Sequence, residues 1–394
     1  MKRISFDFER VRIESTEIDA LFLKTFPEEA QWSHLAERKN LLSFDNSAPW
    51  VEPVRFIPMM PKSEADSLQE LADKAAGKII TIASGAAWSS AKAGVDFFNI
   101  GSDVIFTDRT HDTSTLPILN DEDFCLCVIE DGALSNASQK EYEEIKKLLQ
   151  GKYGSDSRKR IFIFTNNSKS PLAKEDASVC LANPSLTGNA LALSQGPLFL
   201  LAAKGINIKE ILESAELPPL PDTSLFVPNC CGDGCLGKDL VMPFSYTNIK
   251  YYSIVRSLMA AKGKTTEAFL WIDKRFEGIS FWLKNLFMDS GDKLFPNTLS
   301  LDHIDSLMSS VKRNNTSLFE TFLDFGDYDE SPFEENESSL GFMIKSAMHR
   351  QYMSGVPMIR IVVPAADPSS YGDFISMFQR TAKLADIWEG DNAA

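Results

Sequence analysis

Two acidic residues stand where a buried strand turns into a helix. The segment DFCLCVIEDGALSNAS (123–138) is an apolar run that ends at Glu130 and Asp131 and breaks into small polar residues before the helical stretch QKEYEEIKKLLQ. In α/β proteins such turns supply binding sites, and their backbone N–H groups often hold an anion. Two carboxylates would repel an anion here. Ser135 or Asn136 can cap the helix that follows, so the turn serves either as a helix cap or, against its own charge, as an anion site.

The first half of the chain carries the pattern of a parallel sheet. Apolar strands separated by helical stretches are expected over 78–83, 103–107, 124–129, 160–165 and 178–182. Strands that are apolar throughout are typical of a parallel sheet with helices on both faces. Ligands on such sheets bind at the carboxyl ends of the strands, so the turns there are the candidate site.

The second half has a similar rhythm with fewer strands. Strands are expected over 267–272, 318–325 and 358–364, and helices over 246–262, 276–289, 302–312, 339–353 and 370–386. We therefore predict a helical or irregular segment over 1–74, a first α/β domain over 75–215, a linker rich in Pro and Gly over 216–240, and a second α/β domain with a C-terminal helix over 241–394.

Bulk composition narrows the function classes. A formal charge of −15 argues against a nucleic-acid groove, which needs clustered Lys and Arg. No stretch approaches the ~18–20 apolar residues of a membrane span, and MKRISFDFERV lacks a signal-peptide core. Six cysteines without an export signal indicate reduced thiols. We expect a cytoplasmic protein that binds neither nucleic acid nor membrane.

A loop with three cysteines is the one candidate metal site. NCCGDGC (229–235) contains Cys230, Cys231 and Cys235, but no fourth Cys or His lies near them in the sequence. A structural zinc ion requires four ligands. The sequence also lacks Walker and dinucleotide-binding motifs. We therefore expect neither a metal nor a cofactor.

Five segments resemble, in chain order, motifs of the phosphoglucose isomerase family. The most informative, AAKGKTTEAFLWIDKRFEGISFWLKNLFMDSGDK (260–293), is similar to the pattern KGK-x₂-E-V-L-x-P-Y-…-W-x-x-Q-L-x-x-E-S-x-G-K. The others are TNNSKSPLA (165–173), LTGNALALSQGPLFLLAAKGINIKEILESA (186–215), SLFETFLDF (317–325) and SLGFMIKSAMHRQYMSGVPM (339–358). The resemblance covers roughly residues 75–385.

The resemblance implies a fold, an assembly and a reaction. The fold is two sugar-isomerase (SIS) domains, each a flavodoxin-like, three-layer α/β/α unit with a mostly parallel sheet. The assembly is a homodimer, with the site between the domains and completed across the dimer interface. The reaction interconverts aldose and ketose phosphates such as glucose 6-phosphate and fructose 6-phosphate. It needs a phosphate cradle, a base, a ring-opening acid and a positive group for the enediolate.

The binding positions implied by the resemblance have lost most of their polar groups. The family's phosphate loop S-K-S-G-T-T falls on residues Glu130 to Ser135, and these residues keep little of that pattern. In the glycine-rich turn ASGAAWSSAKA (83–93), Gly85 persists, and Ser84, Ser89 and Ser90 either bind a ligand or cap the helix; we favour the cap. The family arginine falls on Asn189, which carries no charge, and Thr187 or Ser185 is a plausible N-cap for the segment that contains it.

The implied catalytic positions have also changed. The family's catalytic glutamate falls on Asp289, which is one methylene shorter and otherwise simply ends a helix. The ring-opening histidine aligns with Asp305, and His303 lies two residues earlier, on another helix face unless the alignment shifts by one turn. The family lysine falls on Phe374, which neither donates a hydrogen bond nor carries charge.

Three functions remain open at this point. We favour a phosphoglucose-isomerase-like protein of impaired or absent activity that binds a sugar-type ligand, a sugar phosphate or a protein partner. The alternative is an active aldose–ketose isomerase of altered specificity, with Asp289 as base and His303 or Asp305 assisting. The third is a structural or interaction protein that uses a homodimer and its acidic surface.

Overall fold

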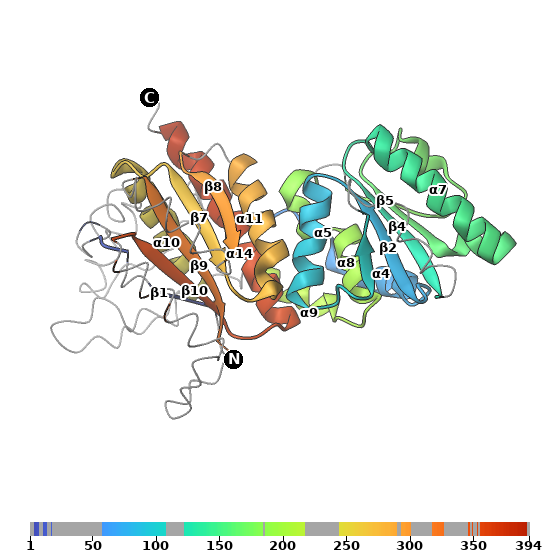
Figure 1. Ribbon diagram of the computed structural model, residues 1–394, viewed down its shortest axis with the longest axis horizontal. Coiled ribbons are helices and arrows are strands. Elements are labelled where there is room, and N and C mark those ends of the chain that lie inside the picture. Colours follow the sequence, from blue (N-terminus) through green and yellow to red (C-terminus); the bar gives the residue numbers. More distant parts are fainter. Residues whose placement is uncertain are drawn as a thin grey trace, which may run out of the picture.

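The protein is built on two five-stranded sheets that lie side by side (Figure 1). The computed structural model describes residues 4–7, 11–13, 17, 57–107, 122–183, 186–216, 244–289, 293–300, 317–326, 346, 349, 353 and 355–391. Of the strand pairs in these residues, only β1–β10 is antiparallel. No helix among them is both long and apolar enough to cross a bilayer. The expected linker 216–240 and its three cysteines lie, except for Glu216, outside the described residues.

The first sheet has the strand order β3-β2-β4-β5-β6. Its strands are β2 (Lys78–Ala83), β3 (Val104–Phe106), β4 (Phe124–Glu130), β5 (Ile161–Thr165) and β6 (Ser178–Leu181). Helix α7 (Asn136–Tyr153) packs on one face, and α5 (Ala86–Phe97) and α8 (Gln195–Ala202) pack on the other. Every residue of β4 is buried, because both of its faces are covered. The expected strands and the layered arrangement are confirmed here.

The second sheet has the order β1-β10-β9-β7-β8. Its strands are β1 (Ser5–Asp7), β7 (Thr266–Trp271), β8 (Phe295–Ser300), β9 (Leu318–Phe325) and β10 (Met358–Val363). Its helices include α10 (Phe244–Ala261), α11 (Glu277–Asp289) and α14 (Pro368–Asp391). A buried Arg256–Glu267 ion pair, 2.6 Å between Nε and Oε2, ties α10 to β7, and Tyr252 also donates to Glu267.

Two strands escaped the sequence analysis, and both lie at an edge of the second sheet. The segment FPNTLS of β8 contains Pro296 and Asn297, which are typical of turns, but proline is tolerated in an edge strand. The three residues of β1 are too few to show a periodicity, and they fall in a segment we expected to be helical or irregular. The pairing of β1 with β10 alone makes it a strand.

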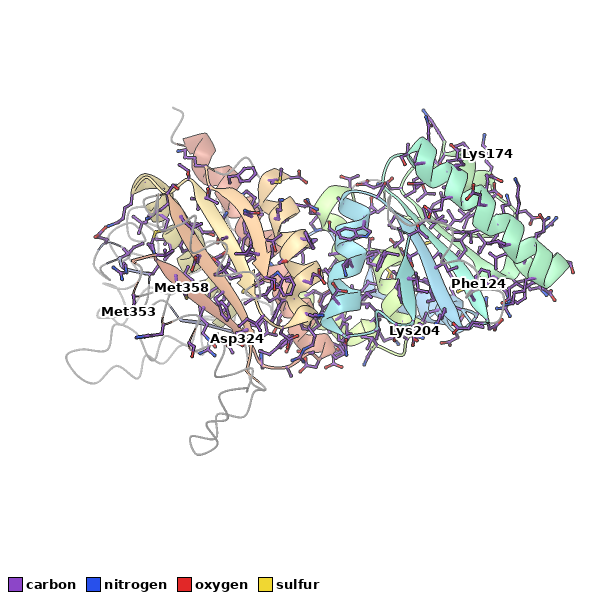
Figure 2. All side chains as sticks on the ribbon, viewed as in Figure 1. Phe124, Lys174, Lys204, Asp324, Met353 and Met358 are labelled. Carbon is purple, nitrogen blue, oxygen red and sulfur yellow. The ribbon has the colours of Figure 1, made fainter. Side chains whose placement is uncertain are left out.

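Helices α5 and α11 join the two halves in antiparallel contact. At one end the Gly278 N–H donates to Asp96 Oδ2 at 2.8 Å, and at the other Asn285 Nδ2 donates to Ser89 Oγ at 3.0 Å. The carboxyl edges of the two sheets therefore point in opposite directions. Figure 2 shows this: Lys174, between β5 and β6, lies above Phe124 at the start of β4, whereas Asp324 near the end of β9 lies below Met358 at the start of β10.

Candidate functional site

The candidate site is the carboxyl edge of the first sheet, meaning the loops that follow β2, β4, β5 and β6. Strand β2 lies between β3 and β4, and all three are parallel, so the order in which the chain adds strands to the sheet reverses between β2 and β4. Ligands of open α/β sheets bind at such a switch point. The two loops that flank it contain Gly85 (φ +58°) and Gly132 (φ +78°), and a Cβ built on either glycine would have no heavy atom within 4 Å. The outer side of both loops is therefore open.

Glu130, at the end of β4, is buried and fully engaged by hydroxyl groups. The Thr165 hydroxyl donates to Oε2 at 2.5 Å, and the Ser170 hydroxyl donates to Oε1 at 2.9 Å. A buried carboxylate is tolerable only when donors satisfy it in this way. The Glu130 side chain therefore links the end of β4, through hydrogen bonds, to the end of β5 and the turn that follows it.

Asp131 bonds to two further loops. Its Oδ2 accepts the Gly188 N–H at 2.9 Å, and its Oδ1 accepts from Asn166 Nδ2 at 2.8 Å. Two asparagines then close the backbone of the turn: the Gly132 N–H donates to Asn166 Oδ1 at 3.0 Å, and Asn167 Nδ2 donates to the Gly132 carbonyl at 2.8 Å. The acids of this turn are thus occupied within the protein.

The caps of the two helices at this edge differ. Ser135 Oγ accepts the Ser138 N–H at 3.1 Å and caps α7, which confirms the capping interpretation of this turn. The expectation that a serine caps α5 is wrong: its N-cap residue is Gly85, without a side-chain cap. Ser89 is fully buried inside α5, where its hydroxyl donates to the Ala86 carbonyl and accepts from Asn285 Nδ2 of α11.

Asn189 and Asp289 come together across the two halves. Asn189 Nδ2 donates to Asp289 Oδ2 at 2.5 Å, and Asp289 is the exposed last residue of α11. The Asn189 carbonyl accepts from Trp282 Nε1 at 3.0 Å and from Gln379 Nε2 at 3.4 Å. Asn189 Oδ1 is buried and has no partner among the described residues. This position therefore touches both α11 and α14.

Of the remaining predicted site residues, the structure describes some and not others. Thr187 is exposed at the start of the 3₁₀ turn Gly188–Leu193 and makes no side-chain cap, so its expected capping bond is absent. Ser84 is half-buried beside Gly85. His303 and Asp305 lie outside the described residues. Phe374 is buried in the core with its ring centroid 4.7 Å from that of Phe378, so it supplies no polar group to the site.

Sequence reasoning missed the amide groups that organise this edge. Asn166 and Asn167 follow β5 directly, and Asn285 lies one helical turn before Asp289. The pair of asparagines after a buried strand was a usable signal, because side chains at that place reach the neighbouring loops. The role of Gly188 depends on a contact 57 positions away and has no local signature.

The site is rich in acceptors and poor in paired cations. Among the described residues, no Lys or Arg forms an ion pair with Glu130, Asp131 or Asp289. Lys169, in the turn after β5, is exposed and is not paired with them. Such a surface suits hydroxyl or ammonium donors better than a dianion.

Comparisons with known proteins agree with this architecture. No family model matches the chain. The glucose-6-phosphate isomerase of Alkaliphilus metalliredigens is 23% identical over 332 residues, covering 76% of this chain and 68% of that protein. The glucose-6-phosphate isomerase of Bacillus cytotoxicus is 22% identical over 436 aligned positions, covering 99% of this chain and 91% of that protein.

Solved structures show the same fold. A hypothetical protein of Thermus thermophilus superposes with a TM-score of 0.68 at 15% identity, covering 98% of this chain and 94% of that one. A glucose-6-phosphate isomerase of Chlamydia trachomatis gives 0.67 at 14% identity, covering 99% and 86%. The expected fold of two SIS-like α/β units is confirmed. The similarity extends over most of the chain, and the five motifs occur in the same order, which supports a divergent protein that resembles the phosphoglucose isomerase family.

Proposed function

We propose that this protein binds a sugar-type ligand at the carboxyl edge of its first sheet and has lost most or all of its relatives' isomerase activity. One observation carries the proposal: the loop that matches the family's phosphate loop holds two carboxylates, and neutral donors of the protein itself already satisfy both. A phosphate ester would have to displace these carboxylates from their donors while facing two like charges.

The changed catalytic positions support the same function. Asn189 stands at the family's arginine and cannot supply the charge that stabilises an enediolate. Phe374 stands at the family's lysine and is part of the core, with its ring near that of Phe276 as well as Phe378. A site that has lost these two cations can keep the shape that binds a sugar. It loses the electrostatic stabilisation of the transition state that accelerates the reaction.

The test is a coupled assay with fructose 6-phosphate, run beside an ordinary isomerase as positive control. We expect turnover far below ~10 s⁻¹, which is typical of enzymes. A thermal-shift panel then compares neutral and amino sugars with their phosphate esters. A ligand at 100 times its Kd adds ~2.7 kcal/mol of stability. Turnover at an ordinary rate, or stabilisation by phosphate esters alone, would contradict the proposal.

A second function is favoured by one contact, the hydrogen bond between Asn189 and Asp289. It holds an exposed carboxylate beside the loops of the first sheet. In this alternative Asp289 is the base of an aldose–ketose isomerase acting on an unphosphorylated sugar. Asp289→Asn would then abolish the interconversion of any sugar that the wild-type protein accepts, and full activity in that variant would rule out this role.

A further inference from the structure

The carboxylate of Asp131 accepts hydrogen bonds from the protein in the way that a bound anion would. Its two oxygens accept a backbone N–H from Gly188 and a side-chain N–H from Asn166, which belong to two different loops. Gly188 has a φ of +59°, a conformation that glycine favours, and its N–H points at the aspartate. The aspartate belongs to a third loop, so a single carboxylate holds together the ends of three segments.

The other donors at this edge are also consumed. The hydroxyl protons of Thr165 and Ser170 point to Glu130, and the Gly132 N–H points to Asn166. Asn166 Nδ2 is shared between Asp131 and the Leu186 carbonyl, the latter at 3.2 Å. A phosphate arriving between these loops would have to compete with the protein's own acceptors for these donors.

We propose that Asp131 is a specificity-determining residue, an internal anion that occupies the donors of Gly188 and Asn166 and thereby selects ligands without a phosphate group. This inference rests on the proposed function, since it names the class of ligand that the same edge accepts: unphosphorylated sugars, neutral or carrying an amino group. Recognition is then by exclusion. Charge and occupied donors reject phosphate esters, whereas a neutral ring meets neither obstacle.

Two substitutions separate charge from donor occupancy. In Asp131→Asn the side chain keeps one acceptor and gains a donor, so it can satisfy only one of the two N–H groups and must release the other. In Asp131→Ala both N–H groups are released and the charge is removed. If the aspartate acts as an internal anion, the affinity for phosphate rises in the order wild type, Asp131→Asn, Asp131→Ala.

The experiment titrates the full chain with inorganic phosphate and with fructose 6-phosphate by calorimetry at low ionic strength. We expect at least tenfold tighter phosphate binding in Asp131→Ala than in the wild type, with Asp131→Asn between them. The control is Glu143→Gln, which removes one negative charge from the exposed face of α7. Its phosphate affinity should stay within twofold of the wild type.

A second measurement shows where the phosphate binds. Amide hydrogen exchange at Gly188 should speed up in Asp131→Ala and slow again when phosphate is added. If Asp131→Ala does not fold, Asp131→Asn carries both measurements. Unchanged phosphate affinity in every folded Asp131 variant, or an equal gain in Glu143→Gln, overturns the role of Asp131.

The two proposals fail in different ways. Ordinary turnover of fructose 6-phosphate by the wild type contradicts the proposed function. A wild type that neither turns over nor binds phosphate esters, together with Asp131 variants that gain no phosphate affinity, contradicts only the inference about Asp131.

Discussion

Asn189 Nδ2 and Asp289 Oδ2 lie 2.5 Å apart and join two residues that are 100 positions apart in the chain. The carbonyl of the same asparagine accepts hydrogen bonds from Trp282 on α11 and Gln379 on α14. One residue in a short turn after the first sheet thus connects that sheet to two helices of the second half. The contact places the carboxylate of Asp289 beside the candidate site.

Asn189→Ala should lower the free energy of unfolding by about 1–2 kcal/mol, because it removes the hydrogen bond to Asp289 but leaves those to its carbonyl. Urea unfolding followed by circular dichroism measures this. Asp289→Asn is the matched control and should cost less, since its amide oxygen still accepts from Asn189. Wild-type stability in Asn189→Ala would show that the contact contributes nothing.

Gly278→Ala should destabilise the contact between α5 and α11 by about 1–3 kcal/mol, because its Cβ would lie 2.5 Å from the carbonyl oxygen of Lys92. The control is Gly151→Ala on α7, where a Cβ meets nothing within 4 Å. That change should stabilise the protein by about 0.5–1 kcal/mol through helix propensity. Equal thermal midpoints for the two variants would refute the close approach of the helices.

Glu320 should make stability fall with rising pH. Burial raises the pKa of its carboxyl from 4.5 to about 8, and no partner is present among the described residues. The folded state holds this proton more tightly than the unfolded state. The contribution of protonated Glu320 to the free energy of unfolding is therefore complete below pH ~4.5 and is lost as the pH rises through about 8. One pKa unit corresponds to about 1.4 kcal/mol.

The variant Glu320→Gln tests that dependence. It keeps the shape and polarity of the protonated acid and cannot ionise. Its unfolding free energy should match the wild type near pH 5 and exceed it by a few kcal/mol near pH 9. Parallel pH profiles for the two proteins would show that Glu320 is not the responsible group.

Arg256→Met should cost about 3–5 kcal/mol of unfolding free energy, because it leaves Glu267 as a buried charge without its cation. The double variant Arg256→Met, Glu267→Leu should recover most of this loss, since two apolar side chains replace the pair. Guanidinium unfolding of the three proteins gives the comparison. A double variant no more stable than Arg256→Met would argue that the pair itself is needed.

Local pattern was enough to place most elements of this fold. The apolar runs 78–83, 124–129 and 160–165 became strands of the first sheet, because a strand covered on both faces needs apolar residues at every position. The span 276–289 was predicted almost to the residue for α11. The strand β8 was missed, because an edge strand is specified by its single neighbour and tolerates turn-forming residues.

The sequence by itself determined the charges at the candidate site: acids at 130 and 131, an uncharged amide at 189 and an aromatic ring at 374. Only the tertiary structure decided what satisfies those acids, since their donors come from Thr165, Ser170, Asn166 and Gly188, 35 to 57 positions away. It also paired Ser89 with Asn285 of α11 and brought Asn189 to Asp289. The physical reason is that patterns of burial are periodic and local, whereas a hydrogen bond between loops depends on the direction of two side chains that the fold alone brings together.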